Sequence, residues 1–264
     1  MDGNTPSVTP ENLLARLGTA NAPLLIDVRR RAAFEGDDRQ VIGAIHCDPD
    51  EVDHWLPKIP ASRMVVTYCA HGHEVSQGVT AALRKSGIQA AYLEGGVAAW
   101  KESNLPTRRK RGAADDKWIT REHPKIDRIA CPWLIGRFIN PEAEFIYVPV
   151  TEVGKVAAEA GGTPYDIKGV EFGHVDDGCS FDAILRIYGI DLPPLSHLAR
   201  IVRGADTSRP DLTPQCEGLL AISYGLSCNF PDDHDMLRHG LIVYDALYAW
   251  CRMQTPFAPT TVKA

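Results

Sequence analysis

A change of pattern close to residue 110 limits what this 264-residue chain can fold into. Before it, short apolar runs such as 64–69 alternate with helical patterns such as 76–87. After it, helical periodicity dominates. Strands that alternate with helices predict a parallel sheet covered by helices on both faces. We therefore expect two domains, an α/β domain followed by a mainly α domain with a few short strands.

The stretch NLPTRRKRGAADDKW (104–118) separates the two patterns. It combines a proline, a basic run, a glycine and an acidic pair without helical or strand periodicity, which is typical of a solvated linker. We expect the first domain over 1–106, the linker over 107–117 and the second domain over 118–264. The second domain is expected to contain helices over 123–140, 179–189, 194–206, 213–227 and 232–254, and short strands over 144–150 and 169–175.

Composition and charge narrow the class of protein. Hydrophobic residues make up 44% of the chain, charged residues 23%, and the net charge is -6. The chain lacks the basic footprint of a nucleic-acid binder. It also lacks a signal-peptide pattern and any apolar run near the roughly 20 residues needed to span a bilayer. We expect a cytoplasmic protein with neither nucleic acid nor membrane as a partner, whose seven scattered cysteines are free thiols.

The segment VVTYCAHGHEVSQG (65–78) places Cys69 between a predicted strand and a predicted helix. In a parallel sheet, ligands bind beyond the carboxyl ends of the strands, which is where this thiol lies. Backbone N–H groups at the start of the following helix would favour its thiolate. The loop residues expected to form the site around the candidate nucleophile Cys69 are Ala70, His71, Gly72, His73, Glu74, Val75 and Ser76.

Four separated motifs give the first domain a family resemblance. LIDVR (25–29), IGAIH (42–46), VVTYC (65–69) and LEGGVAAW (93–100) occur in the order and spacing of a single rhodanese domain, which the stretch 7–106 resembles. The resemblance implies that Cys69 accepts a sulfane sulfur as a persulfide and passes it to a thiol acceptor. The sulfur donor and the acceptor are each a small molecule or a protein, and this domain is expected to need no cofactor.

The loop departs from the common rhodanese pattern in two respects. It is one residue longer, as in the related dual-specificity phosphatases and arsenate reductases, but those enzymes need an arginine six positions after the cysteine. Val75 stands at that position, and the neighbouring Glu74 would oppose a dianion. We therefore expect sulfane sulfur transfer instead of phosphatase or arsenate chemistry, from a donor that need not be a small dianion.

The second domain resembles the C-terminal domain of ChrB-type chromate-resistance proteins. The resemblance rests on the stretches 118–149, 171–185 (EFGHVDDGCSFDAIL), 198–206 (LARIVRGAD) and 232–251. It implies a role in chromate resistance, either in regulation or in accessory detoxification. The regulators carry a DNA-binding segment where this chain has its rhodanese-like domain, so the regulatory role does not carry over.

Two kinds of site are expected in the second domain. Histidines mixed with carboxylates favour Fe or Mn over Zn as a bound metal, and the candidate ligands are Glu171, His174, Asp206, His234 and His239. An acid-rich helix start is the competing explanation of the run 232–235. Arg128 and Arg137 are candidate anion-binding residues for a tetrahedral oxyanion such as chromate, unless they pair with carboxylates and only stabilise the domain.

These patterns lead to one leading function and two alternatives. The leading hypothesis is a rhodanese-type sulfurtransferase that uses a Cys69 persulfide and acts in chromate or oxidative-stress defence. The first alternative is a metal-dependent redox enzyme, such as a superoxide-detoxifying enzyme, in the second domain. The second alternative is a non-enzymatic oxyanion sensor. Cys131 is expected to be a buried packing residue, and the role of Cys179 is left open.

Overall fold

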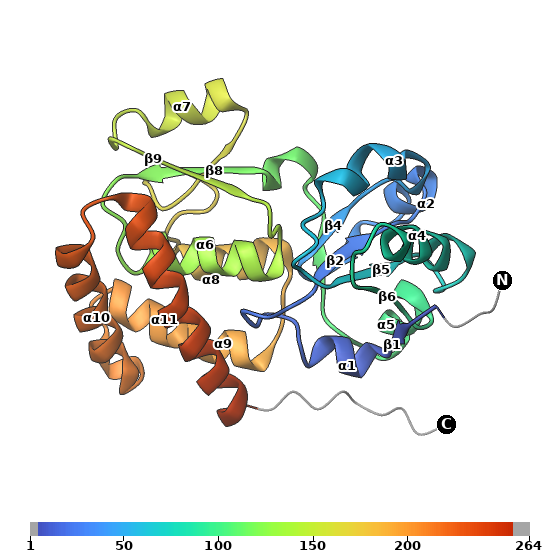
Figure 1. Ribbon diagram of the computed structural model, residues 1–264. Coiled ribbons are helices and arrows are strands. Elements are labelled where there is room, and N and C mark those ends of the chain that lie inside the picture. The colour runs from blue at the N-terminus through green and yellow to red at the C-terminus, as the bar shows by residue number, and fades with distance from the viewer. Residues whose placement is uncertain (1–4, 256–264) are drawn as a thin grey trace. The chain divides into compact units, whose positions relative to one another are not determined.

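The computed structural model describes residues 5–255, and this part of the chain divides into two compact units between Lys110 and Arg111 (Figure 1). The first unit contains a five-stranded parallel sheet with the strand order β1-β6-β5-β2-β4. Its strands are β1 (Ser7–Val8), β2 (Leu24–Asp27), β4 (Ala44–His46), β5 (Val65–Tyr68) and β6 (Ala90–Leu93). Its helices are α1 (Pro10–Leu14), α2 (Arg31–Glu35), α3 (Val52–Trp55), α4 (Glu74–Lys85) and α5 (Gly96–Glu102). The predicted α/β class is confirmed.

The two central strands explain why this sheet is stable. Every residue of β2 and of β5 is buried, as is typical of strands in a parallel sheet that is covered on both faces. Val79 and Leu83 of α4 belong to the same core as Val65. Burial of such side chains contributes about 1.5–3 kcal/mol each, so the apolar run before Cys69 fixes the position of that thiol.

The segment 107–117, predicted to be a solvated linker without regular structure, contains two regular elements. Thr107–Arg109 form strand β7, which pairs antiparallel with β3 (Arg39–Val41). Gly112–Asp115 form a turn of 3-10 helix. The prediction of an unstructured segment is wrong because side-chain charge does not prevent edge pairing: Arg108 is only 4% exposed and donates to the carbonyl of Ala44.

The second unit is mainly helical with a small parallel sheet, as predicted. The sheet has the order β10-β8-β9, with β8 (Lys117–Arg121), β9 (Glu144–Val148) and β10 (Thr163–Pro164). The helices are α6 (Asp127–Phe138), α7 (Val153–Ala160), α8 (Ser180–Tyr188), α9 (Pro193–Asp206), α10 (Gln215–Asn229) and α11 (Asp233–Gln254). The strand predicted over 169–175 is wrong: Gly169 has a φ of +85° and Gly173 closes a turn onto Val170, which breaks the extended backbone.

Helix α6 begins later than the sequence indicates and contains a proline. Its residue before the first turn, Ile126, has a φ of 26°, which a helix cannot continue. Pro132 has no N–H to bond the carbonyl four residues before it. That carbonyl, of Arg128, instead accepts a hydrogen bond of 3.2 Å from the Tyr147 hydroxyl on β9. The partner from β9 explains how a proline is tolerated inside this helix.

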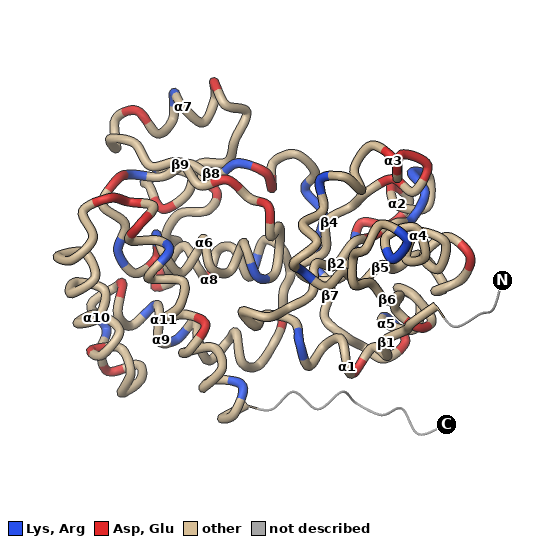
Figure 2. The backbone as a smooth tube through the Cα atoms, viewed as in Figure 1, with Lys and Arg blue, Asp and Glu red and all other residues tan. Residues whose placement is uncertain are grey.

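Charged residues of both signs are interspersed along the backbone of each unit (Figure 2). Acidic residues gather around α3, where Asp50, Glu51 and Asp53 line a shallow cavity with His54. Of the helices formed by residues 5–255, none combines the length and the apolar character needed to cross a bilayer.

Candidate functional sites

Cys69 directly follows β5 and precedes the loop that leads into α4. Ser76 lies in the first turn of that helix, and its hydroxyl is 3.2 Å from the Cys69 sulfur. Burial alone would raise the pKa of Cys69. Hydrogen bonds from the Ser76 side chain and from backbone N–H groups of Ser76, His71 and His73 outweigh it and lower the pKa below its usual value. The loop therefore favours the thiolate, which is the nucleophilic form of cysteine.

Two glycines allow the loop to lie close against the start of α5. Gly72 and Gly96 both have positive φ angles, +70° and +59°. A Cβ atom on Gly96 would lie 2.4 Å from the carbonyl oxygen of Cys69, which real side chains do not allow. The N–H groups of Val97 and Ala98 then donate to the carbonyls of Cys69 and Ala70, each at 3.0 Å. Through these two hydrogen bonds, the start of α5 in the LEGGVAAW motif fixes the cysteine loop in place.

The Cys69 loop borders a cavity of about 660 Å³. The predicted site residues that line it are Cys69, Ala70, His71, His73, Glu74 and Val75. Gly72 and Ser76 do not line it: Gly72 lies against Leu93, Gly95 and Gly96, and Ser76 contacts the sulfur. The cavity also contains Arg30, which sequence analysis missed because it follows β2, far from the loop in sequence. Its side chain is 68% exposed, and its guanidinium supplies a cation where the loop itself has none.

At the border of this cavity, a buried ion-pair network around Arg29 fixes the loop between β2 and α2. Arg29 is 3% exposed and contacts Asp27 at 2.6 Å and Asp37 at 2.7 Å. The hydroxyl of Tyr68, the residue before Cys69, donates to Asp27 at 3.0 Å. Buried charges persist where they are paired and hydrogen-bonded. Arg29 borders the cavity, but its guanidinium is engaged by Asp27 and Asp37 and supports the site.

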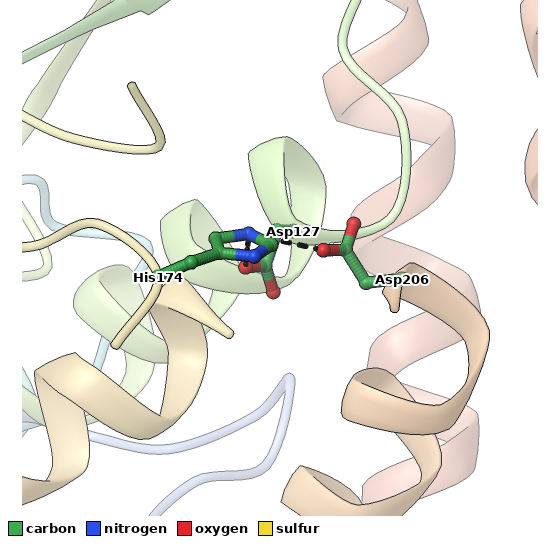
Figure 3. Close-up of side chains that lie close together, drawn as sticks. All are labelled: Asp127, His174 and Asp206. Atoms are coloured by element: carbon green, nitrogen blue, oxygen red, sulfur yellow. Dashed lines mark ion pairs between the residues drawn. The ribbon is translucent and has the colours of Figure 1, made fainter. Parts of the chain in front are cut away.

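A second cluster lies in the mainly helical unit, around the imidazole of His174 (Figure 3). The His174 Nε2 atom lies 3.5 Å from Asp127 Oδ2, 3.2 Å from Asp166 Oδ1 and 3.1 Å from Asp206 Oδ2. The imidazole is 44% exposed, whereas the three carboxylates are 0%, 5% and 18% exposed. The cluster is thus deep on the carboxylate side and open to solvent on the imidazole side.

Backbone geometry brings these four side chains together from separate elements. Asp127 opens α6 directly after the strained Ile126, Asp166 itself has a φ of 51°, and Asp206 ends α9. The chain before His174 is anchored by Phe172, which is 1% exposed and packs edge-on against Trp118 at 5.0 Å. Strained non-glycine residues of this kind are concentrated at functional sites.

In this cluster three carboxylates surround a single imidazole, so negative charge is in excess among these four side chains. Burial, and the carboxylates of Asp206 and Asp166, raise the pKa of Asp127 to about 7. Hydrogen bonds to Asp127, Asp166 and Asp206 raise the pKa of His174 to about 12. The Oδ1 atom of Asp127 is buried without a hydrogen-bond partner. One ligand atom each from Asp127, His174 and Asp206 lie within 4.8 Å of one another, so this group could hold a metal ion.

Comparison with known proteins assigns each unit to a family. The sequence profile of the ChrB C-terminal domain matches residues 118–251, half of the chain. This chain belongs to the ChrB C-terminal domain family. Residues 9–103 match the profile of the rhodanese-like domain, so the protein joins a rhodanese-like domain to a ChrB domain.

One curated relative and two solved structures illustrate these similarities. Protein ChrB of Cupriavidus metallidurans is 32% identical over 146 residues, which cover 55% of this chain and 44% of that protein. A rhodanese-related protein from Thermoplasma volcanium is 22% identical, with 39% of this chain and 96% of that chain covered and a TM-score of 0.35. A rhodanese-like domain protein from Staphylococcus aureus is 26% identical, with coverages of 36% and 90% and a TM-score of 0.33.

Within the ChrB domain, the structure brings together only part of the predicted metal set. His174 and Asp206 lie in the cluster. Glu171 instead pairs with Arg111 at 2.7 Å, the ring of His239 stacks on Phe230 at 3.9 Å, and His234 packs edge-on against Tyr147. Asp127 and Asp166 complete the cluster and were not among the predicted ligands.

The predicted anion-binding arginines of the ChrB domain both contact carboxylates. Arg137 donates to both oxygens of Asp245, at 2.9 and 2.8 Å, as a structural pair would. Arg128 contacts Asp166 at 3.3 Å, which places it beside the His174 cluster. The thiols of Cys131 and Cys179 are almost fully buried, and burial raises the pKa of both well above the usual value.

Replacing Ser76 by alanine is expected to raise the pKa of Cys69. The hydroxyl is one of the groups that lower this pKa, so the pH at which alkylation of Cys69 reaches half its maximal rate should increase. The rate of iodoacetamide labelling, followed by peptide mass spectrometry between pH 6 and 10, measures this shift. Ser86→Ala, at the exposed far end of α4, is the control. An unchanged profile in Ser76→Ala would show that the hydroxyl does not stabilise the thiolate.

Proposed function

We propose that the rhodanese-like domain is a sulfurtransferase that carries sulfur as a Cys69 persulfide. The observation that supports this most directly is the Cys69 loop, whose hydrogen bonds lower the pKa of a thiol that borders a cavity. In the first step the thiolate attacks the outer sulfur of a donor persulfide, the donor sulfur–sulfur bond breaks, and the donor leaves as a thiolate. In the second step an acceptor thiolate attacks the outer sulfur and regenerates Cys69.

The charges around the cavity bear on the donor. Glu74 lines it and disfavours a small dianion, whereas the exposed Arg30 offers a cation. The other lining cation, Arg29, is engaged by Asp27 and Asp37. This mixed set of charges suits a persulfide donor on a small thiol or a protein better than a compact dianion. Membership of the ChrB family supports placing the activity in chromate or oxidative-stress defence.

Intact-mass measurement of the purified full chain with several sulfane donors tests this proposal. We expect a gain of one sulfur atom, located by peptide mapping at Cys69 and absent in Cys69→Ser. Cys228→Ser is the matched control, because Cys228 is an exposed free thiol in the other unit and should not change the transfer rate. Absence of a Cys69 persulfide with every donor would overturn the proposal.

We propose as a second function a metal-dependent redox activity at the His174 cluster, with Fe or Mn as the ion. Asp127, Asp206 and the imidazole of His174, with the Asp166 carboxylate beside them, form an oxygen-rich set, which suits Mn and Fe better than a thiolate site would. Superoxide disproportionation is a reaction that such an ion supports: one superoxide is oxidised to dioxygen, and a second takes up that electron and two protons to give hydrogen peroxide.

Elemental analysis of freshly purified protein tests the second function. We expect about one Fe or Mn per chain, and superoxide consumption that increases with metal content. A chain that stays metal-free after incubation with either ion would exclude the centre. A metal-loaded chain without superoxide consumption would retain the centre and exclude this reaction.

A further inference from the structure

Two arginines lie beside the His174 cluster and approach the same oxygen of Asp166. Arg121 Nη2 is 3.4 Å and Arg128 Nε is 3.3 Å from Asp166 Oδ2. We infer that this centre binds a small oxyanion as a co-ligand, held jointly by the metal ion and by the guanidinium groups of Arg121 and Arg128. The inference rests on the proposed metal centre and adds an oxyanion that binds beside the metal ion.

The balance of charge is the first argument. Asp127, Asp166 and Asp206 contribute three negative charges, and an imidazole that binds a metal is neutral. A divalent ion and two guanidinium groups contribute four positive charges. The loaded centre therefore has one positive charge in excess, in a largely buried region where an uncompensated charge is costly. An anion that binds beside the ion offsets this excess: a singly charged anion cancels it, and a dianion such as sulfate changes the net charge from one positive to one negative.

Hydrogen-bonding capacity is the second argument. A guanidinium group carries five N–H donors. Among the contacts of the described residues, Arg128 uses Nε for Asp166 and Nη1 for the carbonyls of Glu122 and Arg121, and Arg121 uses Nη2 for Asp166. Donors remain on both groups, and the planar guanidinium fork matches the spacing of oxygens in an oxyanion.

Access and coordination number are the third argument. His174 and Arg121 are 44% and 46% exposed, so a small anion reaches the centre from solvent, whereas Arg128 is only 13% exposed and fixes one side. Mn and Fe commonly take about six ligands. The imidazole of His174 and the carboxylates of Asp127 and Asp206, each giving one atom, leave about three positions for Asp166 and for ligands from solution.

Coupled binding of Mn²⁺ and sulfate tests the inference. The affinity of the full chain for Mn²⁺ is measured by electron paramagnetic resonance of the free ion, in sodium sulfate and in sodium chloride at equal ionic strength. We expect sulfate to lower the apparent Kd of Mn²⁺ by at least about 5-fold, the lower end of ordinary coupling between two ligands. Sulfate affinity, measured by calorimetry, should increase by the same factor when Mn²⁺ is present.

Single substitutions identify the residues that hold the anion. Arg121→Gln, at a half-exposed position, should remove most of the coupling, which is the ratio of the Mn²⁺ Kd in chloride to that in sulfate and does not depend on the chloride affinity of the variant itself. If Arg128→Gln folds, it should also remove most of the coupling. If it does not fold, the result for Arg121→Gln alone tests the inference. Arg238→Gln is the control, because Arg238 is exposed on α11 and pairs with Asp235, so its coupling should equal that of the wild type.

The outcomes separate this inference from the proposal beneath it. If Mn²⁺ fails to bind in either salt, the metal centre itself is wrong. If Mn²⁺ binds equally well in sulfate and chloride, the centre stands and the oxyanion co-ligand is wrong. Coupling that persists at full strength in Arg121→Gln and in a folded Arg128→Gln would also overturn the inference.

Discussion

Gly96→Ala is expected to destabilise the rhodanese-like domain by about 2–5 kcal/mol and to abolish persulfide formation. Gly96 has a φ of +59°, and a left-handed conformation costs an alanine roughly 1–2 kcal/mol. The added Cβ would also lie 2.4 Å from the Cys69 carbonyl oxygen and 2.6 Å from the Gly72 nitrogen. Overpacking of this kind costs about 1–3 kcal/mol, and it displaces the loop whose N–H groups stabilise the thiolate.

Urea denaturation and amide hydrogen exchange over residues 69–76 measure this effect, together with the rate of Cys69 persulfide formation. Gly78→Ala is the matched control. Gly78 lies inside α4 with no atom within 4 Å of an added Cβ, so alanine there should stabilise the helix by about 0.5–1 kcal/mol. Wild-type exchange and transfer rates in Gly96→Ala would contradict the role given to the LEGGVAAW motif.

The cysteine loop could be predicted because its determinants are local. An apolar strand, a cysteine, a glycine and a helix follow one another within 65–85. The structure differs in the bounds of the helix, which runs over Glu74–Lys85 instead of 76–87. Arg30 could not be found in this way. It reaches the cavity because β2 lies beside β5 in the sheet, and that adjacency depends on the topology of the whole domain.

The His174 cluster could be predicted only in part, for the same physical reason. His174 and Asp206 were among the candidate ligands because histidines mixed with carboxylates are typical of a metal site. Asp127 and Asp166 were not among the candidate ligands, and the segment 169–175 that follows Asp166 was predicted to be a strand. Three separate elements and two strained residues, Ile126 and Asp166, bring these side chains together. Strain of this kind leaves no periodic signal in a sequence.

Asp127→Asn is expected to weaken Mn²⁺ binding by at least about 100-fold without destabilising the metal-free protein. Substitution of residues that merely support metal ligands costs about 10–100-fold in affinity, and Asp127 would be a direct ligand. Asparagine keeps the size of the side chain and removes a charge that burial and two neighbouring carboxylates disfavour. We therefore expect the free energy of unfolding, measured in chelator, to stay within about 1 kcal/mol of the wild type or to increase, as functional sites often trade stability for activity.

The opposite result is expected if Asp127 only forms a structural ion pair with His174. Removal of one partner from a buried pair costs about 3–5 kcal/mol, so a loss of that size with unchanged Mn²⁺ affinity would exclude the metal centre. Asp245→Asn is the matched control, because it removes a carboxylate with a structural role in the same unit. Asp245 accepts from Arg137 and from the Trp133 indole at 2.8 Å, so its substitution should cost about 1–3 kcal/mol and leave Mn²⁺ affinity unchanged. The two variants together separate a site maintained for binding from one maintained for stability.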